Sequence, residues 1–166
     1  MRQDRTEVLF QGLFAGFIGY VSVVLFFTVV SVLTGESPFY TPALLGGILF
    51  YGVTDPAQTT ISAGPVLVYN GLHLVIFLAF GIVAALLASL AERGAELWSL
   101  ALFLLLFVSA HLFAAVQLFT EPVRDELPLW RIGGAMALAV VAIVGYLFWA
   151  HPSLRHLLQE PEGAEI

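Results

Sequence analysis

VLFQGLFAGFIGYVSVVLFFTVVSVL, residues Val8–Leu33, is an apolar stretch without a charged side chain. A helix that crosses the hydrocarbon core of a bilayer needs about 20 such residues. The stretch follows Arg2 and Arg5, as the apolar region of a secretory signal follows basic residues. It is much longer than the about 7 to 15 residues of such a region, however, and Gly35–Ser37 is a poor cleavage site. We therefore predict a retained membrane span.

Three further stretches of the same kind follow the first. They are Pro65–Leu90, Leu97–Thr120 and Ile132–Ala150. The whole chain is 60% apolar and 11% charged, whereas an average soluble domain has about 25% charged residues. The predicted fold is therefore a single transmembrane domain, residues 1–166: an all-α integral membrane four-helix bundle in contact with the lipid bilayer.

The arginines predict how this bundle is oriented. Four of the six basic residues flank one side of the membrane, and two flank the other. Because cytoplasmic loops carry the excess of positive charge, we expect both termini in the cytoplasm, in the plasma membrane of a bacterium or an archaeon. The four are Arg2, Arg5, Arg93 and Arg155, and the two are Arg124 and Arg131.

The long connection between the first two spans has its own helical pattern. Thr41 is a good N-cap residue, Pro42 suits the first helical position, and the residues that follow are apolar until Gly52. About ten helical residues rise only about 15 Å, which is too short to cross a bilayer. We predict a short helix over about residues 42–52 that lies in the outer interface or enters the membrane as a re-entrant element. A plain surface loop is the alternative.

Small residues recur at helical spacing within the spans. Gly12, Gly16 and Gly19 share one face of the first span, and similar groups surround Gly81 and Gly134. Lipid supplies little hydrophobic drive between helices, so close backbone approach at glycine is a usual source of contact. We expect these positions to pack helices within the bundle, and a homodimer face is the alternative.

Two histidines, His73 and His111, lie inside the spans, whereas every Arg, Asp and Glu lies outside them. Counted along antiparallel helices, both lie roughly 11 to 14 Å below the outer boundary. A costly polar residue inside a span is a candidate functional residue, and imidazole binds haem iron and metal ions. The pair therefore suggests a site for haem b or a metal ion.

Other interpretations of the two histidines stay open. One is a pocket for a quinone or another small ligand. Another is simple hydrogen bonding between helices, which contributes about 0.6 kcal/mol per contact. Adjacent helices 8 to 10 Å apart are also cramped for a haem between two histidines. The neighbouring polar side chains are Tyr69, Asn70, Ser109 and Gln117.

Absent residue types exclude several classes of function. The chain has no cysteine, which excludes disulfides, thiolate catalysis and thiolate-bound iron–sulfur clusters. The net charge of -6 argues against a nucleic-acid partner. The lack of charged side chains within the spans argues against ion-coupled transport. No known catalytic motif is present, so we do not expect an enzyme that acts alone.

The end of the chain forms a short tail, residues 152–166. His151 and His156 are expected at the membrane interface, in a short amphipathic helix over Pro152–Gln159. The residues that follow include three glutamates, Glu160, Glu162 and Glu165, which form an acidic tail.

Three functional hypotheses remain. The first is a small accessory or structural subunit that packs against partner membrane proteins or against itself. The second is a membrane electron-transfer protein that binds haem b or a metal ion through His73 and His111. The third is a small oligomeric channel or carrier, with Pro42–Gly52 as its re-entrant element.

Overall fold

The computed structural model describes residues 5–92, 95–120, 123 and 125–152 of the chain. This part is helical and contains no strand. Its elements are α1 (Arg5–Thr34), α2 (Tyr40–Tyr51), the short 3-10 helix η1 (Pro56–Gln58), α3 (Ala63–Ala91), α4 (Ala95–Thr120) and α5 (Leu129–Ala150). The predicted all-α class is confirmed.

Three helices, α1, α3 and α5, are long and apolar enough to cross a membrane. Each begins two or three residues before the predicted span, so the first turn of α5 includes Arg131. The helix α4 covers the third predicted stretch, Leu97–Thr120, but its described apolar part, Ser99–Ala114, is shorter than a span. The four-span bundle therefore stays a prediction.

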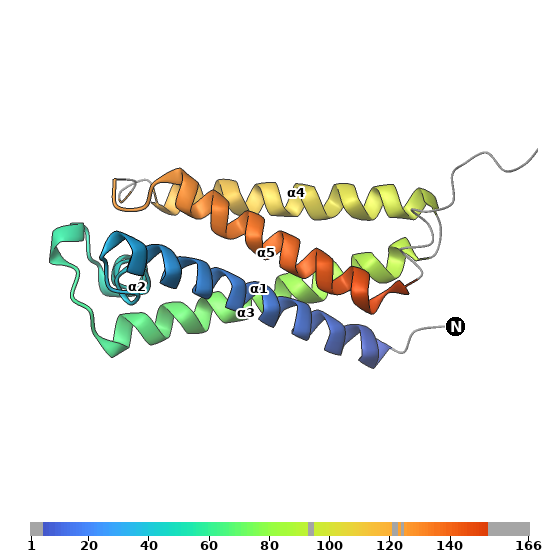
Figure 1. Ribbon diagram of the computed structural model, residues 1–166, viewed down its shortest axis with the longest axis horizontal. Helices are drawn as coiled ribbons and strands as arrows, with labels where there is room; N and C mark the ends of the chain where they lie inside the picture. Colours follow the sequence, from blue (N-terminus) through green and yellow to red (C-terminus); the bar gives the residue numbers. More distant parts are fainter. Residues whose placement is uncertain (1–4, 93–94, 121–122, 124, 153–166) are drawn as a thin grey trace, which may run out of the picture.

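The long helices form two crossing layers (Figure 1). The helix α1 crosses α3 antiparallel near the middle of both, and α5 packs along α1. The helices α3 and α4 pack together near the turn that joins them and diverge toward their other ends. We call the end of the molecule that holds α2 the α2 end, and the opposite one the turn end.

The backbones of α1 and α3 touch at three glycines. A Cβ atom on Gly12 would lie 2.5 Å from the Cα atom of Ile82. A Cβ atom on Gly16 would overlap the backbone of Phe77, and one on Gly81 would overlap the backbones of Gly12 and Gly16. Real side chains do not tolerate such distances, so the crossing needs glycine at all three positions. The close approach gives the van der Waals contact that stabilises helix pairs in lipid.

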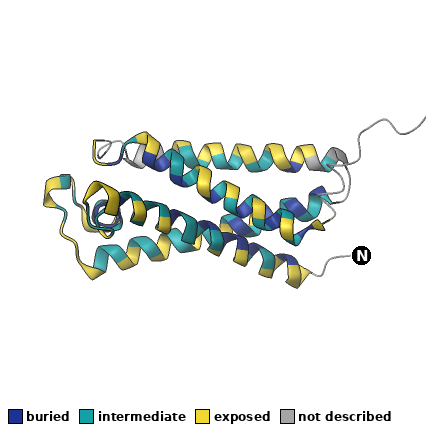
Figure 2. Cartoon of the chain, viewed as in Figure 1, coloured by how far each residue is buried: buried dark blue, intermediate teal, exposed yellow. Residues whose placement is uncertain are grey.

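In the contact between α1 and α5, glycines face side chains rather than the backbone of the other helix. A Cβ atom on Gly19 would lie 2.6 Å from Ile143 Cδ1, and one on Gly134 would lie 2.9 Å from Phe26 Cζ. Each glycine thus leaves space for a large side chain of the facing helix. Buried residues gather along these contacts in Figure 2, whereas the outward faces are exposed and largely apolar. Exposed apolar faces of this extent suit lipid rather than water.

The helix α2 runs across the long helices and is seen nearly end-on in Figure 1. Its Leu44 is fully buried. A Cβ atom on Gly46 would overlap the backbone of Pro65, so α2 lies directly against the start of α3. The helix ends at Gly52, whose φ of 70° favours glycine, and the Val53 N–H donates to the Gly47 carbonyl at 3.1 Å. The segment is therefore a packed helix rather than a plain loop.

The predicted start of this helix is wrong. The helix α2 begins at Tyr40, and Phe39 is its N-cap residue, without a side-chain cap bond. Phe39 already has helical backbone angles, and the Tyr40 N–H donates to the Ser37 carbonyl at 2.9 Å. This turn starts the helix before Thr41 can cap it, and the Thr41 hydroxyl is buried with no hydrogen-bond partner in the described chain.

The glycine crossing can be tested by adding a side chain to α3. We expect Gly81→Leu to lower the free energy of unfolding by about 3 kcal/mol or more, because backbone atoms of α1 cannot yield to a new side chain. Thermal unfolding in detergent measures the loss. Gly71→Leu is the matched control in the same helix, since its Cβ atom would meet nothing within 4 Å. Equal stability of the two variants would contradict the crossing.

Candidate functional site

The ring of His73 lies in an aromatic cluster between α1 and α3. Its ring stacks on that of Tyr69, with centroids 5.3 Å apart and an angle of 20° between the planes. The ring of Phe77 lies 5.0 Å away, and that of Tyr20 on α1 lies 6.1 Å away. Tyr69, His73 and Phe77 are spaced by four residues, which places them on one face of α3. The result is a half-buried imidazole surrounded by aromatic rings.

A hydrogen bond joins α1 to α3 beside this cluster. The Tyr20 hydroxyl donates to Asn70 Oδ1 at 3.0 Å, and Asn70 Nδ2 donates to the Val66 carbonyl at 2.8 Å. Both ends of the Asn70 amide are thus engaged within the protein. The amide is therefore poorly placed to serve as an additional metal ligand next to His73.

The imidazole of His73 has an unmet hydrogen-bonding capacity. Its Nε2 atom is buried and has no hydrogen-bond partner among the described residues. A buried polar atom left in this state costs about 1 to 3 kcal/mol. This atom can accept a hydrogen bond or a metal if it is unprotonated, and can donate one if it is protonated.

The surroundings of His111 are different. Its side chain is exposed, its Nδ1 atom lies 2.9 Å from the Phe107 carbonyl oxygen, and its ring lies 4.0 Å from that of Phe107. These contacts stay within α4, whereas those of His73 are made within α3 and with α1. The two helices also diverge toward the α2 end (Figure 1). None of these contacts joins His73 to His111.

Potential metal ligands do not cluster in the described part of the chain, where no group of three His, Asp or Glu residues could hold a metal ion. The carboxylate of Asp55 accepts from the Ala57 N–H at 2.9 Å and caps η1. The side chain of Gln117, the other amide near the two histidines in the sequence, lies outside the described part.

A partly buried ion pair joins the segment after α1 to α5 at the α2 end. Arg131 is 8% exposed and donates from both terminal nitrogens to Glu36, at 2.9 and 3.1 Å. The guanidinium carbon also lies 5.6 Å from the ring of Trp130. Two-pronged pairing of this kind is strong and directional. The sequence placed both charges beside the membrane without indicating that they meet.

Tyr40 connects α2 to the segment before α5. Its hydroxyl donates to Glu126 Oε2 at 3.3 Å. Partial burial raises the pKa of the Tyr40 phenol, and the negative charge of Glu126 raises it further. The phenol therefore stays neutral and keeps its proton for this bond at physiological pH.

A second polar pair joins α5 to the turn end of α3. His151 is fully buried, and its Nδ1 atom lies 2.9 Å from Glu92 Oε1. The expected place of His151 at the membrane interface stays a prediction, and the structure adds that its imidazole packs against the end of α3. The rest of the predicted tail helix, including His156, lies outside the described residues.

The fold and these contacts define an all-helical protein with three helices suited to a membrane. No family model, no curated protein and no solved structure matches the chain. Its function must therefore be inferred from its own residues.

The pair of Glu36 and Arg131 can be tested by charge removal. Breaking a buried pair costs about 3 to 5 kcal/mol, and we expect about 2 kcal/mol for Glu36→Gln because a third of the Glu36 side chain is exposed. Unfolding in detergent measures the loss. The double variant E36Q/R131M should recover much of it, because no charge is then left unpaired. Asp125→Asn, in an exposed loop, is the control. An additive double variant would contradict the pairing.

Proposed function

We propose that this protein is a small accessory subunit that packs against partner proteins in the membrane. In this proposal α4 also crosses the membrane, so that the bundle has four spans, α2 lies in the outer interface, and both termini are cytoplasmic. The observation that carries the proposal is an open apolar crevice between α4 and α5.

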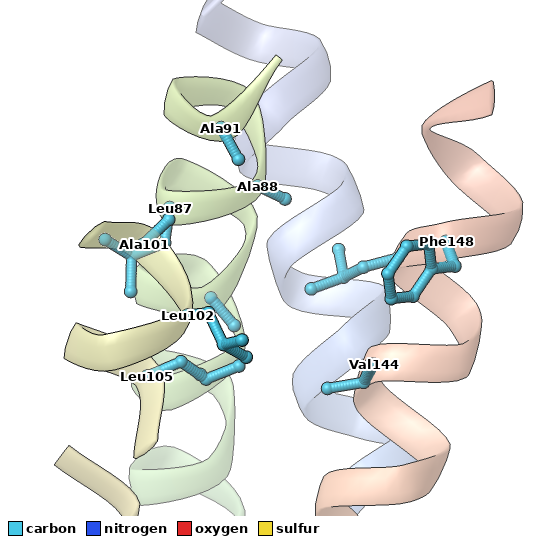
Figure 3. Close-up of a pocket in the computed structure, with 10 residues that line it drawn as sticks. Leu87, Ala88, Ala91, Ala101, Leu102, Leu105, Val144 and Phe148 are labelled. Atoms are coloured by element: carbon cyan, nitrogen blue, oxygen red, sulfur yellow. The ribbon is translucent and has the colours of Figure 1, made fainter. Parts of the chain in front are cut away.

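The α4–α5 crevice encloses about 70 Å³ near the turn end. Figure 3 shows α3 and α4 on one side of it and α5 on the other, with Val144 and Phe148 facing Leu102 and Leu105. Its lining is almost wholly apolar. The lining residues are Ala84, Leu87, Ala88, Ala91, Ala101, Leu102, Leu105, Val144, Leu147 and Phe148.

The crevice marks an incomplete helix interface. In the described residues, α4 packs mainly on α3 and makes few contacts with α5. A closed bundle would fill this space with its own side chains, because protein interiors pack as densely as organic crystals. A side chain from a neighbouring helix would gain van der Waals contact here on three sides. Such contact drives helix association in lipid.

The polar contacts of the chain also support a packing role. Tyr20 bonds to Asn70, Glu36 to Arg131 and His151 to Glu92, so these groups serve contacts between helices of the same chain. The outward faces that remain are largely apolar. They are suited to lipid and to other membrane helices.

The position of α2 supports its proposed place in the interface. The helix runs across the bundle (Figure 1), with Leu44 fully buried and Leu49 and Phe50 exposed. A helix with one face on the protein and apolar side chains outside it suits the boundary between headgroups and acyl chains.

Crosslinking in native membranes tests the proposal. A photo-reactive amino acid at position 102, in the wall of the α4–α5 crevice, should give a discrete crosslinked product with another membrane protein. Val144→Trp should reduce the yield of this product severalfold, because the indole fills the crevice.

Val141→Trp is the matched control for this experiment. It lies one turn away on α5, is 69% exposed and does not line the crevice. It should leave the yield unchanged. A ladder of crosslinked copies of this chain would favour the oligomeric channel or carrier instead, and a product insensitive to Val144→Trp would refute packing at the crevice.

A second candidate function rests on the free Nε2 atom of His73. That atom fits one ligand position of haem b or a metal ion, which would supply electron transfer when bound. The exposed ring of His111 would have to come from a helix that diverges from α3 at this end. The cluster around His73 would hold the imidazole by stacking on Tyr69.

The optical spectrum of the purified protein tests this second candidate. Haem ligation predicts a reduced-minus-oxidised Soret band and α band that disappear in both His73→Ala and His111→Ala. Metal analysis of the same preparation covers ions without such bands. A spectrum without haem bands, together with no stoichiometric metal, would remove this candidate. The Tyr146→Phe variant is a control for general loss of folding.

A further inference from the structure

A second pocket, which we call the outer polar pocket, lies at the α2 end. It encloses about 210 Å³ between α2, the connection after it and the first turn of α3. Its floor is formed by small residues of the two helices, among them Gly47 and Pro65. Its walls carry five side chains with hydrogen-bonding groups. These are Tyr51, Gln58, Thr59, Thr60 and Ser62.

The polar lining of this pocket is neutral. It consists of four hydroxyl groups and one amide, and no charged side chain lines it. Each hydroxyl can both donate and accept a hydrogen bond, as can the amide through its two ends. Phosphate and carboxylate ligands are usually held by arginine or lysine, which this lining lacks. The lining therefore matches a ligand with several neutral hydroxyl groups.

Two features leave hydrogen-bonding groups without a partner next to the pocket. The Thr59 Oγ1 atom is buried and has no hydrogen-bond partner among the described residues. Ser62 precedes α3 without making a side-chain cap bond, so the first N–H groups of that helix receive none from it. By contrast, Asp55 is already bonded to the Ala57 N–H at 2.9 Å, which fixes the turn next to the pocket. The turn next to the pocket is thus fixed, whereas the Thr59 hydroxyl has no partner and the start of α3 has no side-chain cap.

The two helices that line the pocket also carry exposed apolar side chains. Leu49 and Phe50 of α2 are exposed, and so is Leu67 of α3, two residues after Pro65 in the pocket floor. Tyr51, half exposed, adds an aromatic side chain to the pocket wall.

We propose that the outer polar pocket binds a neutral polyhydroxyl group, of the kind carried by a glycosyl lipid or a free sugar. The volume of about 210 Å³ is many times the about 10 to 15 Å³ that a single water molecule needs, so the pocket has room for a group of several polar atoms. The proposal rests on the interfacial position proposed for α2, and it does not depend on the α4–α5 crevice.

Binding can be measured with the full chain in lipid nanodiscs. The probes are monoglucosyl diacylglycerol and phosphatidylglycerol, compared by native mass spectrometry, and free glucose, measured by calorimetry. We expect the protein to retain the glucosyl lipid about tenfold better than phosphatidylglycerol. Binding of free glucose with similar affinity would identify a soluble sugar as the ligand. Equal retention of the two lipids without glucose binding would overturn the proposal.

Two variants locate the binding. Thr59→Val removes the unpartnered hydroxyl at nearly constant shape and should weaken retention of the glucosyl lipid about fivefold. Thr54→Val is the matched control, because Thr54 is exposed in the same connection and does not line the pocket. Equal retention by these two variants and the parent protein would overturn the assignment to this pocket.

The position of α2 is tested separately. The chain has no cysteine, so Thr60→Cys introduces a single thiol at the pocket. Labelling of this thiol in intact cells by a membrane-impermeant maleimide would support the outer position. Labelling only after lysis would overturn both the placement of α2 and the proposed access of an outer-leaflet glycosyl lipid. Loss of the crosslink at position 102 would instead affect only the accessory-subunit proposal.

Discussion

The contact between the backbones of α1 and α3 at Gly12, Gly16 and Gly81 is the constraint on which the rest of the structure depends. In lipid, two apolar helices gain little by leaving their surroundings, so their association needs surfaces that fit closely. Three glycines let the two helices approach until their backbones touch. Other helices pack on this pair: α5 lies along α1 at Gly19, and α2 lies on the start of α3 at Gly46.

The polar contacts are arranged around this crossing. Tyr20 and Asn70 join the same two helices on the α2 side of the glycines. The ends of α5 are each held by a charged or chargeable pair, with Glu36 at one end and Glu92 at the other. Between these ends, α5 is held by the fit of apolar side chains. Polar pairs thus hold the two ends of α5, and apolar packing holds its middle.

The sequence predicted the bounds of the helices better than the contacts between them. Long apolar stretches determine where helices form, so the bounds of α1, α3 and α5 agree within about three residues. Counting along a helix gives depth but not the direction of a side chain relative to other helices. For this reason His73 and His111 were placed in one layer, whereas the structure gives them separate surroundings. The contact of His151 with Glu92 joins residues far apart in the chain, and no local pattern indicates it.

The position of Glu36 has a consequence for the order in which the protein assembles. Arg131 lies in the first turn of α5, where the helix dipole is already positive and disfavours a cation. Glu36 follows the end of α1, where the dipole is negative and disfavours an anion. Each charge is thus poorly placed in its own helix and well placed next to the other. The end of α1 therefore carries an electrostatic mismatch until α5 has been made, and the pair of Glu36 and Arg131 then joins these two helices.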